Sequence, residues 1–528
     1  MNSTEVLRFS DAPRWPLFAA VIVLATLLRG FFYSGFFGSD EVTYVGSAYR
    51  LLGGDWVVRE YVGANRYGVN LPIAAFGAVF GRNEFSAAAY SLLCSLVEVA
   101  IVVGLGARLV GQRGAMLAGV LLASLPVHVH IAGRLMADAP FALAATASFL
   151  FFAEGEARRS RWWWFLAGCA AGWTFWIKPA AVFYIGILLV YPLLFRRFTW
   201  QWICVVFGFA LVVLANNLYF FGLTDRFWFI FEVSSDRRAS GYMHSDLASG
   251  QMHNHAAYYL EHLFGKVYHT WLLGPLFLIG CLLAWRRRAT MNNDERWGVG
   301  YVAFWGLGLL IVLSLLVVKF HPLTLIPKQT NYMLIFVAPL CLLAGWLLAQ
   351  LRGWPLAGAL ALWLAPAMLL GAMLQATTTV FTSNSKGAIA FARANPGAVV
   401  YVSSNAFRAG RFEHLVRSNK SAGLAFESMS NALTASNSGT ARRLAIVDTE
   451  TMAWGSSEPF SRLQDVPACW KRLQTLEPKI EGFGPWAMVR LSGLLEAVSL
   501  PVSLVQRVRA LAAPRPAFVY EVPTLPCS

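Results

Sequence analysis

Long apolar runs separated by short polar breaks fill roughly the first 375 positions of this chain of 528 residues. About 20 apolar residues are needed to cross the hydrocarbon core of a bilayer, so these runs predict membrane-spanning helices. We predict eleven spans, near residues 16–34, 85–107, 114–131, 138–153, 162–177, 179–195, 200–221, 269–285, 298–318, 331–350 and 355–375. The apolar stretch at 71–80 is too short to span and is expected at the membrane interface.

The pattern changes near Ser383, where short apolar runs replace the long ones. The segments AVVYVSSN, ARRLAIVDTE and PWAMVRL predict short strands, and SKGAIAFARA and VPACWKRLQTL predict helices between them. Alternation of strand and helix is typical of an α/β domain. We therefore predict a polytopic α-helical membrane protein, with a transmembrane domain at 1–380 and a C-terminal soluble α/β domain at 381–528.

Composition supports a membrane protein and excludes a nucleic-acid binder. Only 13% of the residues are charged, against about a quarter in soluble domains. The net charge is +15, but the chain has no basic module interleaved with aromatic residues. Arg8 and Arg14 precede the first apolar run and no small-residue cleavage site follows it, which predicts an uncleaved signal anchor.

Basic residues in short breaks between spans predict the orientation of the chain. Cytoplasmic loops carry an excess of Lys and Arg, so these breaks and the N-terminus are expected inside. The breaks contain Arg108, Arg113, Arg158, Arg159, Arg161, Arg196, Arg197, Arg286, Arg287, Arg288 and Arg352. This assignment leaves the loops 35–70 and 222–268, and the C-terminal domain, on the outer side.

The seven cysteines divide into two groups. Five lie in apolar runs and are expected to be small buried hydrophobic residues: Cys94, Cys169, Cys204, Cys281 and Cys341. Cys469 and Cys527 lie in the C-terminal domain and could pair in an oxidising compartment, although their spacing alone does not show a disulfide.

Asp40 and Glu41 form an acid pair just past the outer end of the first span, in FFGSDEVTYVGSAYRLLGGDW. Charges near the hydrocarbon boundary must be hydrated or paired and often mark a site. One interpretation is a helix start, with Ser39 as N-cap and both acids in the first turn. The other is a carboxylate fixed as a general base that takes a proton from a hydroxyl acceptor.

Two cations lie in tight turns on the predicted outer side. The excess of basic residues in cytoplasmic loops does not account for them. Arg134 and Lys178 each stand between two spans, and Asp138 opens the span after Arg134, followed by Pro140. Snorkelling of the cations and an acid in a first helical turn would be a purely structural explanation. The functional interpretation is a phosphate site, to which Lys328 would add a further cation.

The outer loop 222–268 and the segment after it are rich in histidine. The spacing of His244, His253, His255, His262 and His269 matches no standard zinc pattern. His128 and His130 stand two residues apart and so do not share a helix face. We predict no metal site and no required cofactor, while the sequence leaves a divalent cation open. The loop is expected to bind a sugar or a lipid head group.

Taken in order, these stretches resemble the GT-C fold glycosyltransferases, in the branch of the protein O-mannosyltransferases and the lipid A aminoarabinose transferases. The similarity extends over about residues 30–375. The shared motifs are D-E-x-x-Y at Asp40, Glu41 and Tyr44, then Gly54-Asp55-Trp56, Arg66-Tyr67-Gly68 through Pro72, Asp138 with Pro140, Lys178, Arg237 with His255 and Tyr258-Tyr259, and Lys328 with Tyr332 and Pro339. The Lys-Pro-Pro of the aminoarabinose transferases is missing between Tyr61 and Pro72.

The resemblance implies a hexosyl or pentosyl transferase of a bacterial inner membrane, with its active site on the periplasmic side. It would move a sugar from a polyprenyl-phosphate carrier to a hydroxyl of a glycan, glycolipid or protein. Asp40 would be the base of an inverting displacement, with Asp138 and Glu41 as further catalytic acids. Lys178, Arg134 and Lys328 would bind the phosphate. Sugar and acceptor contacts are expected from Tyr44, Arg66, Tyr67, Arg237, His255, Tyr258, Tyr259 and Tyr332.

Two other functions fit parts of the same pattern. A transporter or flippase for a lipid-linked sugar would also need cations near the membrane. It should, however, carry polar residues on both faces and often internal repeats, and neither is visible. A non-catalytic assembly subunit on the same fold is the third possibility, against which Asp40 and Lys178 argue.

Overall fold

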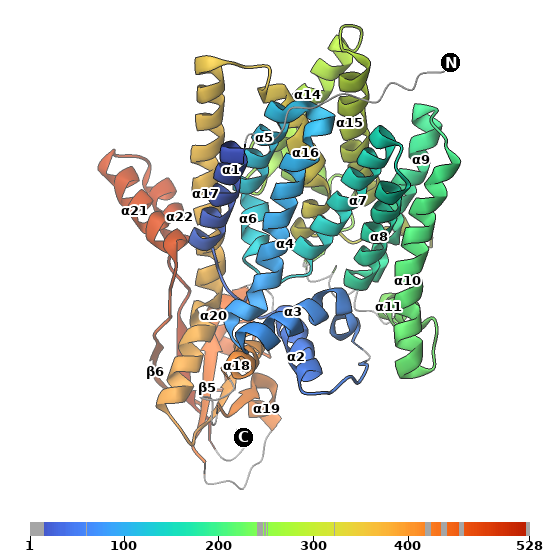
Figure 1. Ribbon diagram of the computed structural model, residues 1–528. Helices are drawn as coiled ribbons and strands as arrows, with labels where there is room; N and C mark the ends of the chain where they lie inside the picture. The colour runs from blue at the N-terminus through green and yellow to red at the C-terminus, as the bar shows by residue number, and fades with distance from the viewer. Residues whose placement is uncertain are drawn as a thin grey trace.

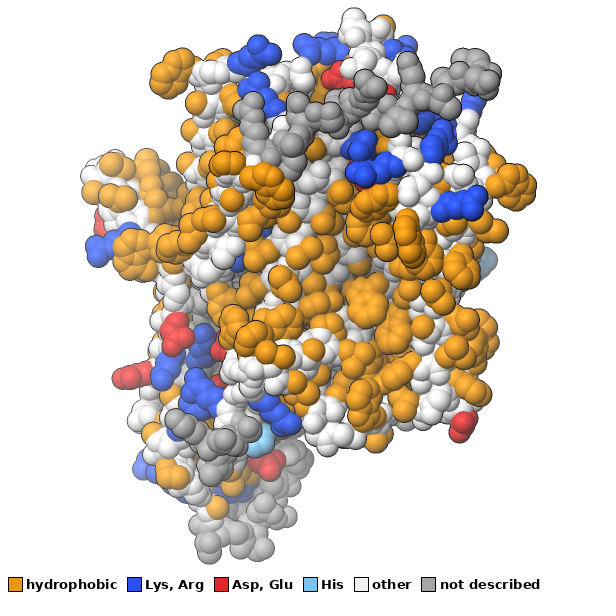
Figure 2. All heavy atoms as spheres, viewed as in Figure 1, with side chains coloured by type: hydrophobic (Ala, Val, Ile, Leu, Met, Phe, Trp, Pro, Cys, Tyr) orange, Lys and Arg blue, Asp and Glu red, His pale blue; other side chains and the backbone are white. Residues whose placement is uncertain are grey.

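A helical bundle makes up most of the molecule, and a small α/β domain lies at one end of it (Figure 1). The computed structural model describes residues 15–59, 61–239, 247, 250, 252–321, 323–417, 424–434, 441–453 and 459–523. Hydrophobic side chains cover the bundle between its two ends, where charged side chains gather (Figure 2). This belt is what a membrane-embedded surface requires, since lipid tails do not solvate charge.

The bundle contains a helix at each of the eleven predicted spans. Its helices are α1 (Trp15–Phe31), α4 (Glu84–Gly104), α5 (Ala107–Ser124), α6 (Pro126–Ala132), α7 (Asp138–Arg158), α8 (Arg161–Ile177), α9 (Ile185–Phe195), α10 (Ile203–Thr224), α14 (Leu273–Arg287), α15 (Asn293–Leu315), α16 (Leu334–Leu348) and α17 (Gly353–Ala394). Among the described residues, five helical stretches are long and apolar enough to cross a membrane by themselves, or six if the bent pair α5–α6 is one span. That pair bends by 59° where Pro126 starts α6, because a proline cannot continue the hydrogen bonding of the preceding helix.

Short elements lie at the end of the bundle nearer the α/β domain (Figure 1). They are α2 (Glu41–Leu52), η1 (Val62–Asn65), α3 (Tyr67–Phe80), η2 (Pro179–Tyr184), η3 (Trp200–Trp202, at the far end of α10), α11 (Phe229–Ala239), α13 (Tyr258–Leu260), η4 (Glu261–Gly265), β1 (Val317–Lys319), β2 (Thr324–Leu325) and η5 (Thr330–Met333). The stretch 71–80 is the later part of α3.

The C-terminal domain is built on a five-stranded mixed sheet in the order β4-β3-β5-β7-β6. β3 runs parallel to β4 and β5, whereas β7 runs antiparallel to β5 and β6. The strands are β3 (Val399–Val402), β4 (Phe426–Ser428), β5 (Arg443–Asp448), β6 (Lys471–Leu476) and β7 (Ala517–Glu521), and the helices are α18 (Ser404–Val416), α19 (Met429–Thr434), α20 (Thr449–Ala453), η6 (Leu463–Asp465), α21 (Phe483–Ala497) and α22 (Val502–Ala510). The predicted α/β tail is thus confirmed.

One helix joins the two parts of the molecule. α17 has 42 residues, and its C-terminal residues Ala388 and Ala392 lie in the core of the α/β domain with Val400 and Val402. The predicted limit between residues 380 and 381 therefore falls inside a continuous helix.

Two of the short segments in the tail were assigned wrongly from the sequence. PWAMVRL lies in α21, where Gly484, Met488 and Ser492 are buried at the four-residue spacing of a helix. The Lys-Arg-Leu-Gln-Thr-Leu part of the predicted helix VPACWKRLQTL is strand β6, which pairs with β7 at the sheet edge. An apolar run of this length is compatible with a helix or a strand, and the neighbouring elements in the fold determine which of the two forms.

The cysteines follow the expected division as far as they are described. The five cysteines in apolar runs are free, and Cys94 and Cys341 among them are buried. Cys469 is disulfide-bonded. Cys527 lies outside the described residues.

We expect Asp448→Asn to stabilise the C-terminal domain at neutral pH. Burial raises the pKa of Asp448 to about 6, although bonds from Asn384 and the Glu450 amide oppose it. A carboxyl group whose pKa is raised by folding stabilises the folded state at a pH below its ordinary pKa of 3.8. This stabilisation is lost as the pH rises through about 6. The variant should gain up to about 3 kcal/mol at pH 7.5 and little at pH 4. Thermal unfolding at both pH values measures this, and an equal gain at both would contradict it.

Candidate functional site

Asp40 lies at the centre of a hydrogen-bonded group on the domain side of the bundle. Its Oδ1 accepts from the Tyr61 hydroxyl at 2.8 Å, and its Oδ2 accepts from the Tyr44 hydroxyl at 3.2 Å. Arg66 Nη1 lies 3.8 Å from Asp40 Oδ2 and also donates to the Tyr44 hydroxyl. Asp40 occupies the N-cap position of α2 but makes no side-chain cap bond, and about a third of its side chain is exposed. The carboxylate therefore faces the two tyrosine hydroxyls and solvent and does not cap the backbone N–H groups of α2.

A second acid is paired with the lysine between two spans. Lys178 Nζ lies 2.5 Å from Asp138 Oδ1, and Asn331 Nδ2 donates to Asp138 Oδ2 at 3.0 Å. Lys178 also lies 4.5 Å from the centre of the Tyr332 ring. Asp138 is the first residue of α7, and Lys178 directly follows α8. Asn331 and Tyr332 lie in η5, which precedes α16. Three outer turns therefore meet at this ion pair.

The two groups form one electrostatic unit. Burial lowers the pKa of Lys178, the nearby Arg66 lowers it further, and the carboxylates of Asp138 and Asp40 oppose both. Burial raises the pKa of the Tyr44 hydroxyl, and the carboxylates of Asp40 and Asp138 both lie close enough to raise it further. We call Asp40, Tyr44, Arg66, Asp138 and Lys178 the charged cluster.

Glu41 holds the loop that carries Asp40. Its carboxylate accepts hydrogen bonds from the backbone N–H groups of Phe37, Gly38 (2.7 Å) and Ser39 (3.0 Å), and it is 1% exposed. Three backbone donors on one carboxylate fix the segment 36–40, which we call the acid loop. The acid pair of the sequence thus divides into a loop anchor and an accessible carboxylate.

The C-terminal domain contacts the acid loop from its other side. Asn405 Nδ2 donates to the Phe37 carbonyl at 2.8 Å, and Phe412 stacks on Phe36 with ring centres 4.9 Å apart. Gly38 has a φ of +89°, which favours glycine, and a Cβ there would lie 2.4 Å from Asn405 Nδ2, so a larger residue would displace the Asn405 side chain from its bond to Phe37. The domain therefore helps to fix the position of Asp40.

Arg134 is buried next to the acid loop. Its guanidinium lies 4.2 Å from the centre of the Phe37 ring. Burial lowers the pKa of Arg134, and the carboxylates of Glu41 and Asp138 oppose that effect. Within the described part of the chain, the Nε atoms of Arg134 and Arg66 are buried and have no hydrogen-bond partner. Buried donors without an acceptor are costly, and a bound anion would satisfy them.

Lys328 is not joined to the charged cluster. Its backbone pairs with His253, and its Nζ donates to the Ile326 carbonyl at 3.1 Å. Burial lowers the pKa of Lys328 to about 8. No carboxylate among the described residues forms an ion pair with it.

The aromatic residues of the later outer loop form one side of the same region. The Tyr258 hydroxyl lies 3.1 Å from Thr330 Oγ1, one residue before Asn331. Tyr259 is fully buried, and it lies close enough to Tyr332 and Asp138 to interact with them electrostatically. His255 is about half exposed and lies 3.5 Å from Glu261.

The two other predicted contact residues are Tyr67 and Arg237. Tyr67 is buried and packs edge-on against Tyr219 and Phe220, which is a packing role. Arg237 is in α11, but its side chain lies outside the described part of the structure.

The sequence did not single out two residues of the site. Tyr61 contacts Asp40, and Asn331 contacts Asp138. Tyr61 belongs to the outer loop 35–70 and Asn331 directly precedes Tyr332, but no spacing rule separates them from other polar residues in outer loops.

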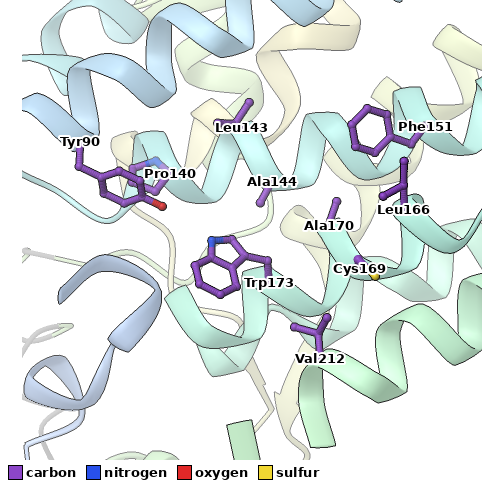
Figure 3. Close-up of a pocket in the computed structure, with 10 residues that line it drawn as sticks. All are labelled: Tyr90, Pro140, Leu143, Ala144, Phe151, Leu166, Cys169, Ala170, Trp173 and Val212. Carbon is purple, nitrogen blue, oxygen red and sulfur yellow. The ribbon is translucent and has the colours of Figure 1, made fainter. Parts of the chain in front are cut away.

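An apolar groove of about 370 Å³ lies between α4, α7, α8 and α10 (Figure 3). It extends from Pro140 and Tyr90 past Trp173 to Phe151 and Leu166. The remaining lining residues are Leu143, Ala144, Cys169, Ala170 and Val212. Pro140 is two residues from Asp138 in the first turn of α7, and Trp173 is in the last turns of α8 before Lys178. One end of the groove is therefore near the Asp138–Lys178 pair.

No group of three His, Cys, Asp or Glu residues within the described ranges could hold a metal ion. The prediction about metals stays untested, because part of the histidine-rich loop is outside those ranges.

Comparison with known proteins finds a family model and solved structures that are similar to this chain. Residues 68–220 match the family model described as dolichyl-phosphate-mannose-protein mannosyltransferase. No curated protein sequence matches the chain. The crystal structure of ArnT from Cupriavidus metallidurans bound to undecaprenyl phosphate is similar, with a TM-score of 0.57 and 16% identity, over 84% of this chain and 94% of that one.

A second solved protein shares the same architecture. The oligosaccharyltransferase of Archaeoglobus fulgidus has a TM-score of 0.52 and 11% identity, over 82% of this chain and 69% of that one. At this identity the likeness establishes the fold alone. The chain therefore has the GT-C fold, and its residues 68–220 are similar to the dolichyl-phosphate-mannose-protein mannosyltransferases.

Proposed function

We propose that the protein is a glycosyltransferase that moves a sugar from a polyprenyl-phosphate carrier to a hydroxyl acceptor. The observation that carries this proposal is the charged cluster at one end of an apolar groove, with buried arginine N–H groups of Arg66 and Arg134 unpaired among the described residues. Such a site combines an anion-binding end with a channel for an apolar chain. The undecaprenyl phosphate bound to ArnT likewise joins a phosphate to a long apolar chain.

The donor would bind with its polyprenyl chain in the groove and its phosphate at Lys178 and Arg134. Lys178 would reach the phosphate from its present position on Asp138, which holds the ammonium at 2.5 Å. Lys328, joined to the His253 strand bridge, would act in the outer loop rather than on the phosphate. A monophosphate leaving group can be neutralised by these fixed cations.

The transfer would be a single in-line displacement with inversion at the anomeric carbon. Asp40 would accept the proton of the acceptor hydroxyl, whose oxygen forms the new bond to the anomeric carbon. The bond from that carbon to the phosphate oxygen would break, and polyprenyl phosphate would leave. Tyr44, Tyr61 and Arg66 would hold the Asp40 carboxylate in position through the contacts described above.

The remaining site residues would bind the sugar and the acceptor. Tyr332 lies beside Lys178, and Tyr258 and Tyr259 continue the surface toward His255. Aromatic rings and hydroxyls of this kind are typical of sugar pockets. We propose the same role for Arg237, whereas Tyr67 would support α3 from within. Hexoses and pentoses, and glycan, lipid or protein acceptors, all remain candidates.

The charge distribution supports an orientation of the bundle in the membrane. Arginine residues gather at the end of the bundle away from the C-terminal domain (Figure 2). By the positive-inside rule that end would face the cytoplasm of a bacterial inner membrane, and the charged cluster would face the periplasm.

The first test is to incubate the purified protein with radiolabelled polyprenyl-phosphate sugars and candidate acceptors. Transfer by the wild type but not by Asp40→Asn would support the proposal and name the donor. Movement of the intact polyprenyl-phosphate sugar across a vesicle membrane, without transfer of the sugar, would instead favour the flippase alternative. In that case the motion would be independent of Asp40.

We expect Ala170→Trp to weaken use of long-chain donors. The indole would occupy the groove next to Trp173, so the KM for a long-chain donor should rise about tenfold with little change in kcat, as expected when uniform binding is lost. Steady-state kinetics with long-chain and two-isoprene donors measure the effect, which should shrink with the shorter chain. The matched control is Ala361→Trp, on an exposed part of α17. Equal KM values for the two variants would exclude the groove as the chain site.

A further inference from the structure

A helical hairpin leaves the sheet of the C-terminal domain and returns along the bundle (Figure 1). α21 and α22 form its two arms, with the turn at residues 498–501. The hairpin follows β6 and precedes β7, so both of its ends are fixed in the sheet. None of the roles proposed above uses it.

Contacts at the base of the hairpin locate it at the membrane boundary. The Phe483 ring lies 6.1 Å from Phe31 and 6.0 Å from Phe32, at the last turn of α1. A Cβ on Gly484 would lie 2.3 Å from the Ala372 carbonyl, so α21 packs directly on the backbone of α17. These contacts are at the domain-side end of two helices of the apolar belt.

From that base α21 runs obliquely, outward from the bundle and back toward the end of the bundle that lies away from the C-terminal domain (Figure 1). Met488 and Leu491 belong to one apolar cluster with Leu28 and Leu24 of α1 and with Met368 of α17. Leu24 and Met368 lie further from the C-terminal domain along their helices than Phe31 and Ala372 do. Since α21 has 15 residues, it extends about 22 Å in this direction.

The outer surface of the hairpin is largely apolar and exposed among the described residues. No charged residue occurs from Val498 to Val505. The large apolar side chains that are 39–69% exposed are Trp486, Val489, Leu494, Val498, Leu500, Val502 and Leu504. Soluble domains rarely expose a patch of this kind. The neighbouring face of α1 has the same character, with Val23, Leu27 and Phe31 more than half exposed.

The charges on the hairpin are compatible with lipid. Glu496 and Arg509 form an ion pair at 2.6 Å, and the Arg490 guanidinium lies 5.9 Å from the centre of the Trp486 ring. The fourth charged residue, Arg507, is exposed in the last turn of α22, away from the tip. Pairing lowers the cost of charge near a bilayer, and long arginine side chains can reach the head groups. The charged side chains of this protrusion that are visible in Figure 2 lie at its lower edge, toward the C-terminal domain.

We propose that the α21–α22 hairpin is immersed in the lipid leaflet adjacent to the C-terminal domain, as a re-entrant hairpin with acyl chains as its partner. The exposed face continues the lipid-facing surface of α1, and half of the hydrocarbon core is about 15 Å thick, so a tilted hairpin of this length fits within one leaflet. Immersion fixes the domain to the bilayer at a second point besides α17. This anchoring keeps α18 against the acid loop.

The test measures lipid and water access at the tip of the hairpin in the full-length protein. The five free cysteines are replaced by alanine, Val498→Cys or Val502→Cys is added, and the new thiol carries a bimane label in nanodiscs. Leu463→Cys, on the 42% exposed Leu463 of the α/β domain, is the matched control. Lipids brominated on their acyl chains should remove most of the tip emission, and aqueous iodide should leave it unchanged. The Leu463 label should respond in the opposite way.

Two results would overturn the proposal. Quenching of both tip labels by iodide would show that the hairpin lies in water. Protection of both labels from either quencher would show that protein, such as a second copy of this chain, covers the hairpin. The second tip position guards against a local defect of one variant, and neither outcome depends on the proposed transferase activity.

Discussion

Replacing Asp40 with Asn is expected to lower the rate of sugar transfer by about 10²- to 10⁴-fold, the usual contribution of a general base. An amide at this position can still accept a hydrogen bond from Tyr61 at Oδ1, but it cannot take the proton of the acceptor hydroxyl. Binding of the lipid donor should change little, since Lys178 and Arg134 remain. The measurement is kcat and KM with the donor identified in the panel assay.

Asp55→Asn is the matched control for this experiment. Asp55 lies in the same outer loop and is also acidic, but it pairs with Arg59 at 2.9 Å and both side chains are more than a third exposed. Its loss should leave transfer nearly unchanged, because exposed ion pairs contribute little. Full activity of Asp40→Asn, or an equal loss in both variants, would exclude Asp40 as the base.

The membrane part of the fold could be predicted because lipid imposes a strong rule on the sequence. Every backbone polar group inside a bilayer must be paired within its own element, so spans appear as long apolar runs. Each predicted window accordingly contains a helix. The number of helices that cross by themselves was harder to predict, since breaks such as the one at Pro126 divide apolar runs into shorter pieces.

The charged cluster could be predicted only in outline. Asp40, Arg66, Asp138 and Lys178 were all assigned to one face, because alternate connections of a helical bundle meet at one end. Which side chain contacts which depends on the directions of side chains at helix ends. For that reason Glu41 turned out to bind the acid loop, and Lys328 turned out to lie at a strand bridge.

The C-terminal domain shows where short patterns fail. PWAMVRL alternates enough to suggest a strand, yet it belongs to an α-helix whose exposed face is apolar. Such a face contradicts the pattern of a helix in a water-soluble domain. Immersion of the hairpin in lipid would remove the contradiction, since the outward side chains would then lie in an apolar phase.

Replacing Lys178 with Met is expected to lower stability and to abolish transfer. Asp138 is 3% exposed and would keep only Asn331 as a partner, and breaking a buried ion pair in this way costs about 3–5 kcal/mol. Thermal unfolding measures the loss of stability. Lys386→Met is the matched control, since Lys386 pairs with the mostly exposed Glu481 and should contribute less than about 1 kcal/mol.

The double variant Lys178→Met with Asp138→Asn separates stability from chemistry. It removes both charges, so no carboxylate is left buried without its cation, and most of the lost stability should return. Transfer should not return, because the phosphate of the donor would still lack the ammonium that neutralises it. A stable double variant with restored turnover would show that Lys178 serves only to neutralise Asp138. A stable but inactive one would show that transfer needs the ammonium or the carboxylate itself. A raised KM for the lipid donor in Lys178→Arg, which keeps Asp138 and its charge partner, would then assign donor binding to Lys178.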